Sequence, residues 1–330
     1  MRFRFDHATV WVAVLGPVCM FGQPVPSTAD LISHVRGAAV RETPRASLRV
    51  DASLVQIPVQ VTSEWGRSID RLNKEDFRIF EDNVEQQITT FSRDDAPVSV
   101  GLVLDTSGSM QPKMERAVDA AAAFFRAANP EDEFFLVEFN ERPRLALGFA
   151  QDTGPISQWI AHARPFGRTS LFDAIGLALK QLKKAKYYRR ALVVLSDGGD
   201  NRSRLTLSEI KNLVMESDAQ LYAMGIYGTR MATREEMNGP HLLDQLAGVT
   251  GGSHFRVDNL EDLPKVSARI AYEMRNQYVL GYSPSNDTLD GKFRRVRVAF
   301  VPAYETQRFR LHYRTGYYAP LDAEDDSEER

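Results

Sequence analysis

The chain has 330 residues, enough for about two domains. Its 43% hydrophobic, 26% charged and 10% aromatic residues are ordinary for a globular protein and exclude collagen-like, coiled-coil and low-complexity chains. The 41 Lys and Arg residues nearly balance the 44 Asp and Glu residues, and the net charge is −3. This balance argues against a nucleic-acid binder that works by bulk positive charge.

The N-terminal segment, residues 1–22, has the features of a secretory signal peptide. Arg2 and Arg4 precede an apolar stretch from Ala8 to Gly22. This stretch is too short, and too interrupted by proline, to favour a membrane span. We expect cleavage after Gly22 or Ala29 and therefore a secreted or periplasmic protein.

Cys19 is the single cysteine and lies inside this apolar stretch. The cleaved protein would then contain no cysteine, which excludes disulfide frameworks, Cys-ligated zinc and thiol catalysis. A lipid anchor on Cys19 is the less favoured alternative, because residues 16–18 make a poor lipobox.

The next two segments predict a flexible lead-in and a β-rich segment. Residues 23–46 are rich in Pro, Ser, Ala and Arg and lack periodicity. Within residues 47–96, apolar and other residues alternate from Val55 to Val61, which predicts a strand, and Pro58 places this strand at a sheet edge. Residues 77–80 and 88–91 predict a hairpin that turns at 81–83.

Residues 97–277 predict a doubly wound α/β domain. Apolar strands at 98–104, 133–139, 191–195, 220–226 and 253–257 alternate with helices at 113–128, 171–184 and 206–216. A closing amphipathic helix follows, with Leu263, Val266, Ile270 and Met274 on one face. The expected fold class is therefore α/β, with a mostly parallel, Rossmann-like sheet.

Residues 278–320 return to β patterning, with a strand at 278–282 and a second hairpin. Val296, Val298 and Phe300 lie on one face of its first strand, and Phe309, Leu311 and Tyr313 lie on one face of its second. Neither β-rich flank has enough strands to be stable alone. We therefore expect the two flanks to pair into one β-sandwich-like module in which the α/β domain is inserted. Residues 321–330 carry a net charge of −5 and predict a disordered acidic tail.

Basic residues alternate with apolar ones on both strands of this second hairpin. They are Arg295, Arg297, Arg308, Arg310, His312 and Arg314. A polyanion site is one interpretation. The favoured one is a solvated sheet face that pairs with acidic residues of the tail.

Oxygen-bearing side chains follow two of the predicted strands of the α/β domain and open one of its helices. Asp105, Ser107 and Ser109 come directly after strand 98–104, Thr169 opens the helix that begins near Leu171, and Asp197 follows strand 191–195. Ligands of doubly wound sheets bind at the carboxyl ends of the strands. Hard oxygen donors suit Mg²⁺ or Mn²⁺, with Ca²⁺ less favoured by so compact a set.

This pattern resembles the von Willebrand factor type A domain, whose metal ion-dependent adhesion site has an Asp-x-Ser-x-Ser loop, a Thr and a further Asp. The resemblance covers roughly residues 97–278. It implies that Asp105, Ser107, Ser109, Thr169 and Asp197 form a complete site for a divalent cation. The flanks, near 74–83 and 313–320, resemble the bacterial secreted VWFA-related family often met in acidobacteria.

The resemblance implies a non-enzymatic, adhesion-type protein whose metal is completed by a Glu or Asp carboxylate of a protein partner. In related domains the closing helix moves when the metal site changes, and both a moving and a fixed helix remain open here. The alternative function is an envelope assembly or chaperone-like scaffold with a mainly structural metal. A metal-dependent hydrolase is disfavoured because no general base stands beside the ligands in the sequence.

Other catalytic and ligand-binding motifs are missing from the sequence. The chain has no His-Glu-x-x-His spacing for zinc hydrolysis, no P-loop and no Gly-x-Ser-x-Gly nucleophile elbow. We expect Asp200 and Asn201 to shape their loop and cap the next helix.

Overall fold

The computed structural model describes residues 54–93, 96–227, 234–301 and 309–321, with only the backbone of 234–236. The predicted signal peptide, Cys19, the lead-in, Arg308 and the acidic tail beyond Leu321 lie outside these ranges. Within them, no helix is long and apolar enough to cross a membrane.

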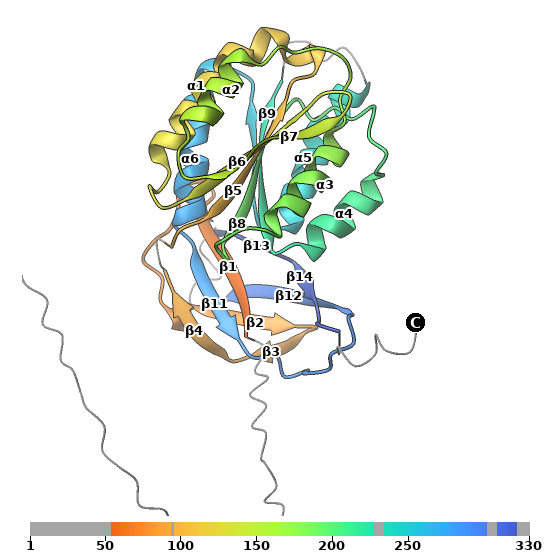
Figure 1. Ribbon diagram of the computed structural model, residues 1–330. Helices are drawn as coiled ribbons and strands as arrows, with labels where there is room; N and C mark the ends of the chain where they lie inside the picture. The colour runs from red at the N-terminus through yellow and green to blue at the C-terminus, as the bar shows by residue number, and fades with distance from the viewer. Residues whose placement is uncertain (1–53, 94–95, 228–233, 302–308, 322–330) are drawn as a thin grey trace, which may run out of the picture. The chain divides into compact units, whose positions relative to one another are not determined.

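A six-stranded sheet forms the centre of the α/β domain (Figure 1). Its strand order is β10-β9-β8-β5-β6-β7, and all neighbours are parallel except β6 and β7. The strands are β5 (Ser99–Asp105), β6 (Glu133–Phe139), β7 (Pro143–Ala150), β8 (Arg190–Ser196), β9 (Ala219–Ile226) and β10 (His254–Val257). β5 lies between β6 and β8, so the winding reverses there, and a ligand site is expected at its carboxyl end.

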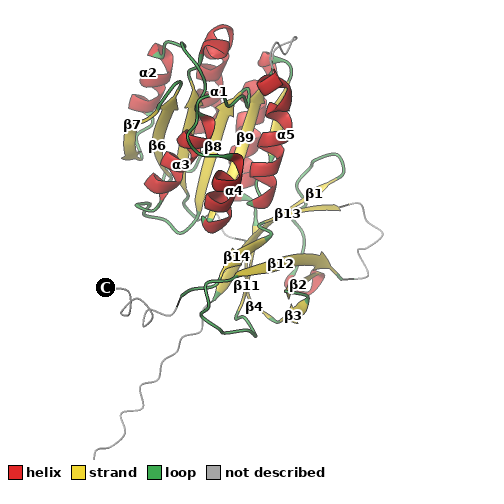
Figure 2. Ribbon diagram, turned by 90° about the vertical axis from the view of Figure 1, so that its right-hand side faces the viewer, coloured by secondary structure: helices red, strands yellow, loops and turns green. Residues whose placement is uncertain are grey.

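Helices cover both faces of this sheet (Figure 2). One face packs against α1 (Met114–Ala127), α2 (Gly154–His162) and α6 (Leu263–Arg275). The other packs against α3 (Leu171–Leu182), α4 (Leu207–Glu216) and α5 (Arg234–Val249). Strand β5 is buried along its whole length, as a central parallel strand covered on both faces must be.

The flanking segments form two four-stranded sheets that share one core. The first has the order β13-β1-β11-β4 and the second β14-β12-β2-β3. Their strands are β1 (Val55–Ser63), β2 (Phe77–Glu81), β3 (Val84–Gln86), β4 (Ile88–Ser92), β11 (Tyr278–Tyr282), β12 (Phe293–Phe300), β13 (Phe309–Tyr313) and β14 (Gly316–Tyr318).

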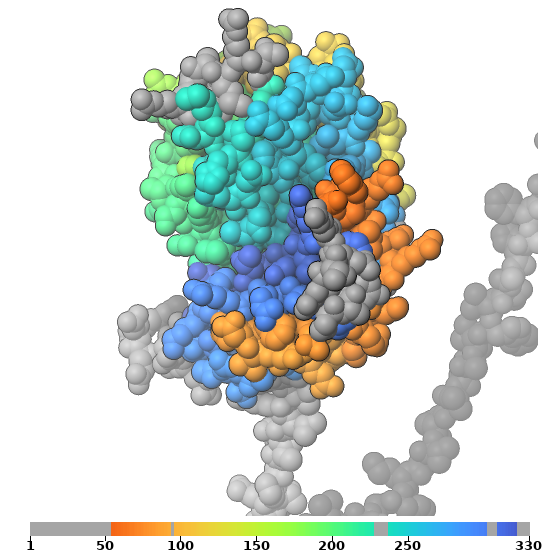
Figure 3. Space-filling view, turned by 180° about the vertical axis from the view of Figure 1, so that it is seen from behind, coloured from red at the N-terminus to blue at the C-terminus, as the bar shows by residue number. Residues whose placement is uncertain are grey.

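Strands from the two ends of the chain pair with one another in both sheets. β1 pairs with β11 and β13, and β2 pairs with β12. β1 therefore lies inside its sheet, and the edge position predicted from Pro58 is wrong: Pro58 pairs with Val279 of β11, and the pairing with β13 begins only at Val59. Figure 3 shows the orange and blue ends of the described chain gathered in one module. The expected fold class, an α/β domain flanked by a β module built from both ends, is confirmed.

Both predicted hairpins are wrong in their partners. β2 turns at Asp82 and Asn83, which have positive φ, but it pairs with β3 rather than with 88–91, which forms β4 in the other sheet. β12 and β13 do not pair with each other, because β12 pairs with β2 and β14 whereas β13 pairs with β1. The alternation predicts the strands correctly, but alternation does not specify a partner.

The predicted basic face is divided between these two sheets. Arg295 and Arg297 are exposed on β12, where Arg297 stacks 3.8 Å from the ring centroid of Phe80. His312 lies on β13, is partly buried, and is 3.3 Å from the Thr62 hydroxyl. The described basic residues therefore do not form one surface for a polyanion.

Candidate metal site

Three loops meet at the carboxyl end of β5. The first loop holds Asp105, the last residue of β5, and Ser107. It continues into the 3₁₀ helix η2 (Gly108–Lys113), which contains Ser109. The second loop holds Thr169, two residues before α3, and the third holds Asp197, directly after β8. β5 and β8 are neighbouring parallel strands, which brings their terminal acids to the same edge.

Backbone hydrogen bonds hold the three loops together. The Gly108 amide donates to the Gly167 carbonyl at 3.1 Å, joining the first loop to the second. The Asn201 amide donates to the Thr169 carbonyl, and Asn201 Oδ1 accepts from the Thr169 amide, both at 3.0 Å. Gly167 has φ +73°, a conformation that glycine adopts without strain.

Asp105 is fully buried and is held through both carboxylate oxygens. Oδ1 accepts from the Ser107 amide at 2.8 Å, and Oδ2 accepts from the Ser196 hydroxyl at 2.6 Å. Burial, and then the negative charge of Asp197, raise the pKa of Asp105 to about 7. A nearby cation would oppose this shift, because positive charge favours the ionised carboxylate.

Asp197 is 3% exposed and lies beside a buried cation. The Lys113 ammonium is 3.3 Å from Oδ2 of Asp197, and the Gly199 amide donates to Oδ1 at 3.4 Å. The loop can turn here because Gly198 has φ +78°, a conformation that glycine adopts without strain. A side chain at position 198 would also collide with the backbone of Gly239.

The three hydroxyl residues complete the donor set. The Ser107 and Ser109 hydroxyls lie 3.2 Å apart, and Thr169 is 6% exposed on the adjoining loop. Two carboxylates and three hydroxyls are hard oxygen donors, which fit a divalent cation such as Mg²⁺. Within the described ranges, no three His, Cys, Asp or Glu side chains cluster as metal ligands, so this candidate depends on the hydroxyls.

Sequence reasoning missed two side chains at this edge. Ser196 contacts Asp105, and Lys113 pairs with Asp197. The available signal was that Ser196 is the last residue of β8, at the same carboxyl edge of the sheet as the predicted ligands. Nothing in the sequence pattern indicated that Lys113 would turn inward.

Asp200 and Asn201 shape their loop, as expected, but the cap they provide is on a different helix. Asp200 accepts from the Phe172 amide, at the first turn of α3, at 3.3 Å. The next helix, α4, is instead capped by Thr206, whose hydroxyl accepts from the Glu209 amide. The expectation that these residues cap α4 was wrong, because the folded chain places the start of α3 next to Asp200.

Part of this domain matches a known protein-family model. Residues 100–199 match the von Willebrand factor type A domain. The matched segment runs from β5 to the loop after β8 and so includes all five candidate ligands. The six-stranded mixed sheet with helices on both faces is the fold of that domain.

Curated relatives are also similar to part of the chain. The inter-alpha-trypsin inhibitor heavy chain H2 of Sus scrofa is 27% identical over 151 residues, which is 41% of this chain. The match spans only 16% of the length of that relative.

Solved structures are also similar. A von Willebrand factor type A protein from Catenulispora acidiphila is 12% identical, with a TM-score of 0.48, over 86% of this chain and 77% of that one. BatB, a conserved hypothetical protein from Bacteroides thetaiotaomicron, is 19% identical, with a TM-score of 0.45, over 54% of this chain and 98% of that one.

Proposed function

We propose that this protein binds Mg²⁺ through Asp105, Ser107, Ser109, Thr169 and Asp197 and uses the bound ion to recognise a carboxylate of a partner protein. Mn²⁺ or Ca²⁺ are the alternative ions. The observation that carries the proposal is the pair of buried carboxylates on neighbouring strand ends, of which only Asp197 has a lysine partner among the described residues.

The donor set leaves a bound cation short of charge. Two carboxylates could neutralise a divalent ion, but Lys113 already offsets part of the charge of Asp197. The hydroxyls of Ser107, Ser109 and Thr169 add oxygens without charge. When bound, the ion would supply positive charge that attracts an anionic oxygen from outside, and a Glu or Asp side chain of a partner meets that requirement.

Residues beside the site offer a surface for such a partner. Phe166 is 61% exposed, and its amide donates to the Thr106 carbonyl within the first loop. Arg168, between Gly167 and Thr169, is also exposed. An exposed aromatic ring and a basic side chain next to a cation suit an acidic partner segment.

We infer that the site binds rather than catalyses. In the described part of the chain, Lys113 is the titratable side chain that hydrogen-bonds a candidate ligand from outside the set, and its pairing with Asp197 makes it a poor general base. We also propose that the protein works outside the cytoplasm, as its N-terminal signal-like segment indicates. N-terminal sequencing of the native protein tests this, and intact Met1 on cytosolic material would contradict it.

The proposed function is tested by capture of a partner under two conditions. The full chain is immobilised and exposed to native envelope extract, once with Mg²⁺ and once with EDTA, and Asp105→Asn is treated in the same way. We expect a protein that is retained only by the wild type and only with Mg²⁺. Equal retention in EDTA, or by Asp105→Asn, would contradict the metal-dependent role.

Phe166→Ala separates the partner surface from the ion. We expect this variant to keep the wild-type affinity for Mg²⁺ while it retains less of the captured protein. Loss of Mg²⁺ binding instead would show that Phe166 supports the site itself.

A further inference from the structure

A cavity lies between the α/β domain and the β module, at the opposite ends of the strands from the candidate metal site. It has a volume of about 400 Å³. Its lining includes Arg190 at the start of β8, Gln220 in β9, and Arg314 and Tyr317 next to and within β14. A cavity of this size is within the range of sites that bind small molecules or peptide side chains.

Three buried hydrogen-bond donors in this lining have no acceptor among the described residues. They are Nε of Arg190, Nε2 of Gln220 and Nε of Arg314. Buried donors in native proteins nearly always have a partner, so three on one cavity indicate a ligand that supplies oxygen acceptors.

The orientation of the Gln220 amide is fixed by its neighbours. Its Oε1 accepts from Gln277 Nε2 at 2.8 Å and from the Tyr222 hydroxyl at 3.4 Å. Both donors require the oxygen at that position, so the NH₂ group must take the other one. Gln220 therefore presents a donor, and not an acceptor, to the cavity.

The other two arginines of the lining are already engaged. Arg314 donates from Nη1 to Asp218 at 2.5 Å and from Nη2 to the Gln56 carbonyl at 3.1 Å. Arg189 donates to the Ala96 and Met274 carbonyls. Among the arginines of the described lining, Arg190 is therefore the one that can form an ion pair with a ligand.

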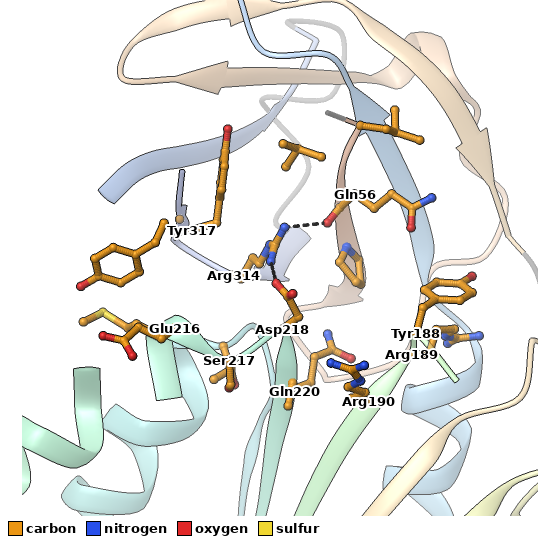
Figure 4. A pocket seen from close by; sticks show the side chains of 18 of the residues that line it. Gln56, Tyr188, Arg189, Arg190, Glu216, Ser217, Asp218, Gln220, Arg314 and Tyr317 are labelled. Carbon is orange, nitrogen blue, oxygen red and sulfur yellow. Dashed lines mark hydrogen bonds and ion pairs between the residues drawn. The ribbon is translucent and has the colours of Figure 1, made fainter. Parts of the chain in front are cut away.

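The positions of these side chains leave Arg190 accessible to an anion. Figure 4 shows Arg190 next to Gln220, with Glu216 on the far side of the cavity. Asp218 is turned toward Arg314. A planar carboxylate matches the two-pronged geometry of an arginine and can also accept from the Gln220 amide.

Part of the lining is apolar and open to solvent, beside polar residues such as Glu216 and Asp287. Four large side chains of the lining are exposed: Leu54 by 45%, Tyr188 by 59%, Leu289 by 41% and Tyr318 by 37%. Exposed apolar side chains that rim a polar pocket are typical of sites that bind another polypeptide. They indicate an occupant longer than a simple anion.

We propose that this cavity binds an apolar peptide segment that presents a carboxylate to Arg190 and Gln220. The carboxylate fills the vacant acceptor position, and apolar side chains of the peptide pack on Leu54, Tyr188, Leu289 and Tyr318. The carboxylate can be the C-terminus of the peptide or an acidic side chain. The site is independent of the metal, because Arg190 lies at the opposite end of β8 from Asp197.

The test uses three pools of apolar pentapeptides with the full chain and saturation-transfer NMR in the presence of EDTA. One pool has a free C-terminus and no Asp or Glu, one is amidated and contains Asp or Glu, and one is amidated without acids. Binding of the first pool identifies a C-terminal carboxylate, and binding of the second an acidic side chain. Failure of both, or equal binding of the third, would overturn the proposal.

Variants of Arg190 test whether this side chain binds the carboxylate of the peptide. We expect Arg190→Met to weaken binding roughly tenfold or more, as the loss of a charge-assisted hydrogen bond does. Arg71→Met, a change at an exposed arginine of the β module, serves as the matched control and should bind as the wild type does. Arg190→Lys keeps the positive charge but cannot donate two parallel hydrogen bonds to one carboxylate, so it should bind with intermediate strength. Unchanged binding by both Arg190 variants would contradict the site.

Discussion

The ammonium group of Lys113 lies 3.3 Å from Oδ2 of Asp197, and both side chains are almost fully buried. The buried ammonium supplies positive charge there without a metal, and it competes with a metal for the same oxygen. Lys113 is thus a built-in counter-ion of the candidate site.

Lys113→Met should have opposite effects on the stability of the protein and on its affinity for Mg²⁺. Without Mg²⁺ we expect the free energy of unfolding to fall by about 3 kcal/mol, because a buried carboxylate loses its partner. With Mg²⁺ we expect tighter ion binding than in the wild type, because the competing charge is gone. Denaturant unfolding and calorimetry measure the two effects. The exposed Lys180→Met is the matched control, and weaker Mg²⁺ binding by Lys113→Met would show that Lys113 assists the ion.

Thr169 should matter less to the ion than the two acids. Thr169→Ala removes an uncharged oxygen, so we expect a smaller loss of Mg²⁺ affinity than Asp105→Asn causes, whereas Thr169→Ser should restore it. Calorimetric titration compares the three variants. A loss as large as that of Asp105→Asn, or no rescue by Ser, would argue that Thr169 acts through the loop backbone.

Protonation of His312 should lower the stability of the β module. Burial, followed by the charges of Arg310 and Arg269, lowers the pKa of His312. The unfolded chain, with an ordinary histidine pKa of about 6.5, therefore takes up this proton first, and stability falls as the pH drops through that value.

The variant His312→Gln tests this pH dependence. We expect the stability lost between pH 7.5 and pH 5 to be smaller in His312→Gln than in the wild type, as measured by thermal or urea unfolding at each pH. His241→Gln, on an exposed position of α5, should retain the full loss. The same loss in both variants would assign it to other groups.

Helix α6 is anchored by arginine contacts at several points. Arg275 donates to the Ala127 carbonyl, Arg269 to the Gly66 carbonyl, and Arg189 to the Met274 carbonyl. We therefore expect α6 to stay in place when Mg²⁺ binds. Hydrogen exchange over residues 261–282 should be the same with and without Mg²⁺, and a clear change in protection would instead favour a moving helix.

The central sheet was predictable because its strands are buried on both faces. Continuous apolar runs such as 191–195 mark such strands, and the acids Asp105 and Asp197 close after two of these runs mark the ligand edge. β7 was missed because it is an antiparallel edge strand that is mostly half-exposed and has no clear alternation. α5 was missed because Gly239 and Pro240 interrupt its helical pattern.

The rest of the site could not be read from the sequence, because it depends on contacts between distant loops. The positions of Asp105 and Asp197 follow from the ends of their strands. The inward turn of Lys113 does not, since a lysine at a helix start usually faces solvent. Strand partners in the β module were equally hidden, because β1 meets β13 only through residues about 250 apart in the chain.

Calorimetric titration of Mg²⁺ into the full chain and into Asp105→Asn tests the central claim most directly. Asparagine keeps the shape of the side chain but removes its charge, so we expect Mg²⁺ affinity to fall by about 100-fold, or about 2.7 kcal/mol. Without metal the variant should be at least as stable as the wild type, since its repulsion with Asp197 is gone. Asp258→Asn, at an exposed position, should bind as the wild type does. If the wild type and Asp105→Asn bind Mg²⁺ with equal affinity, or if neither binds it, Asp105 does not hold a metal and the account is wrong.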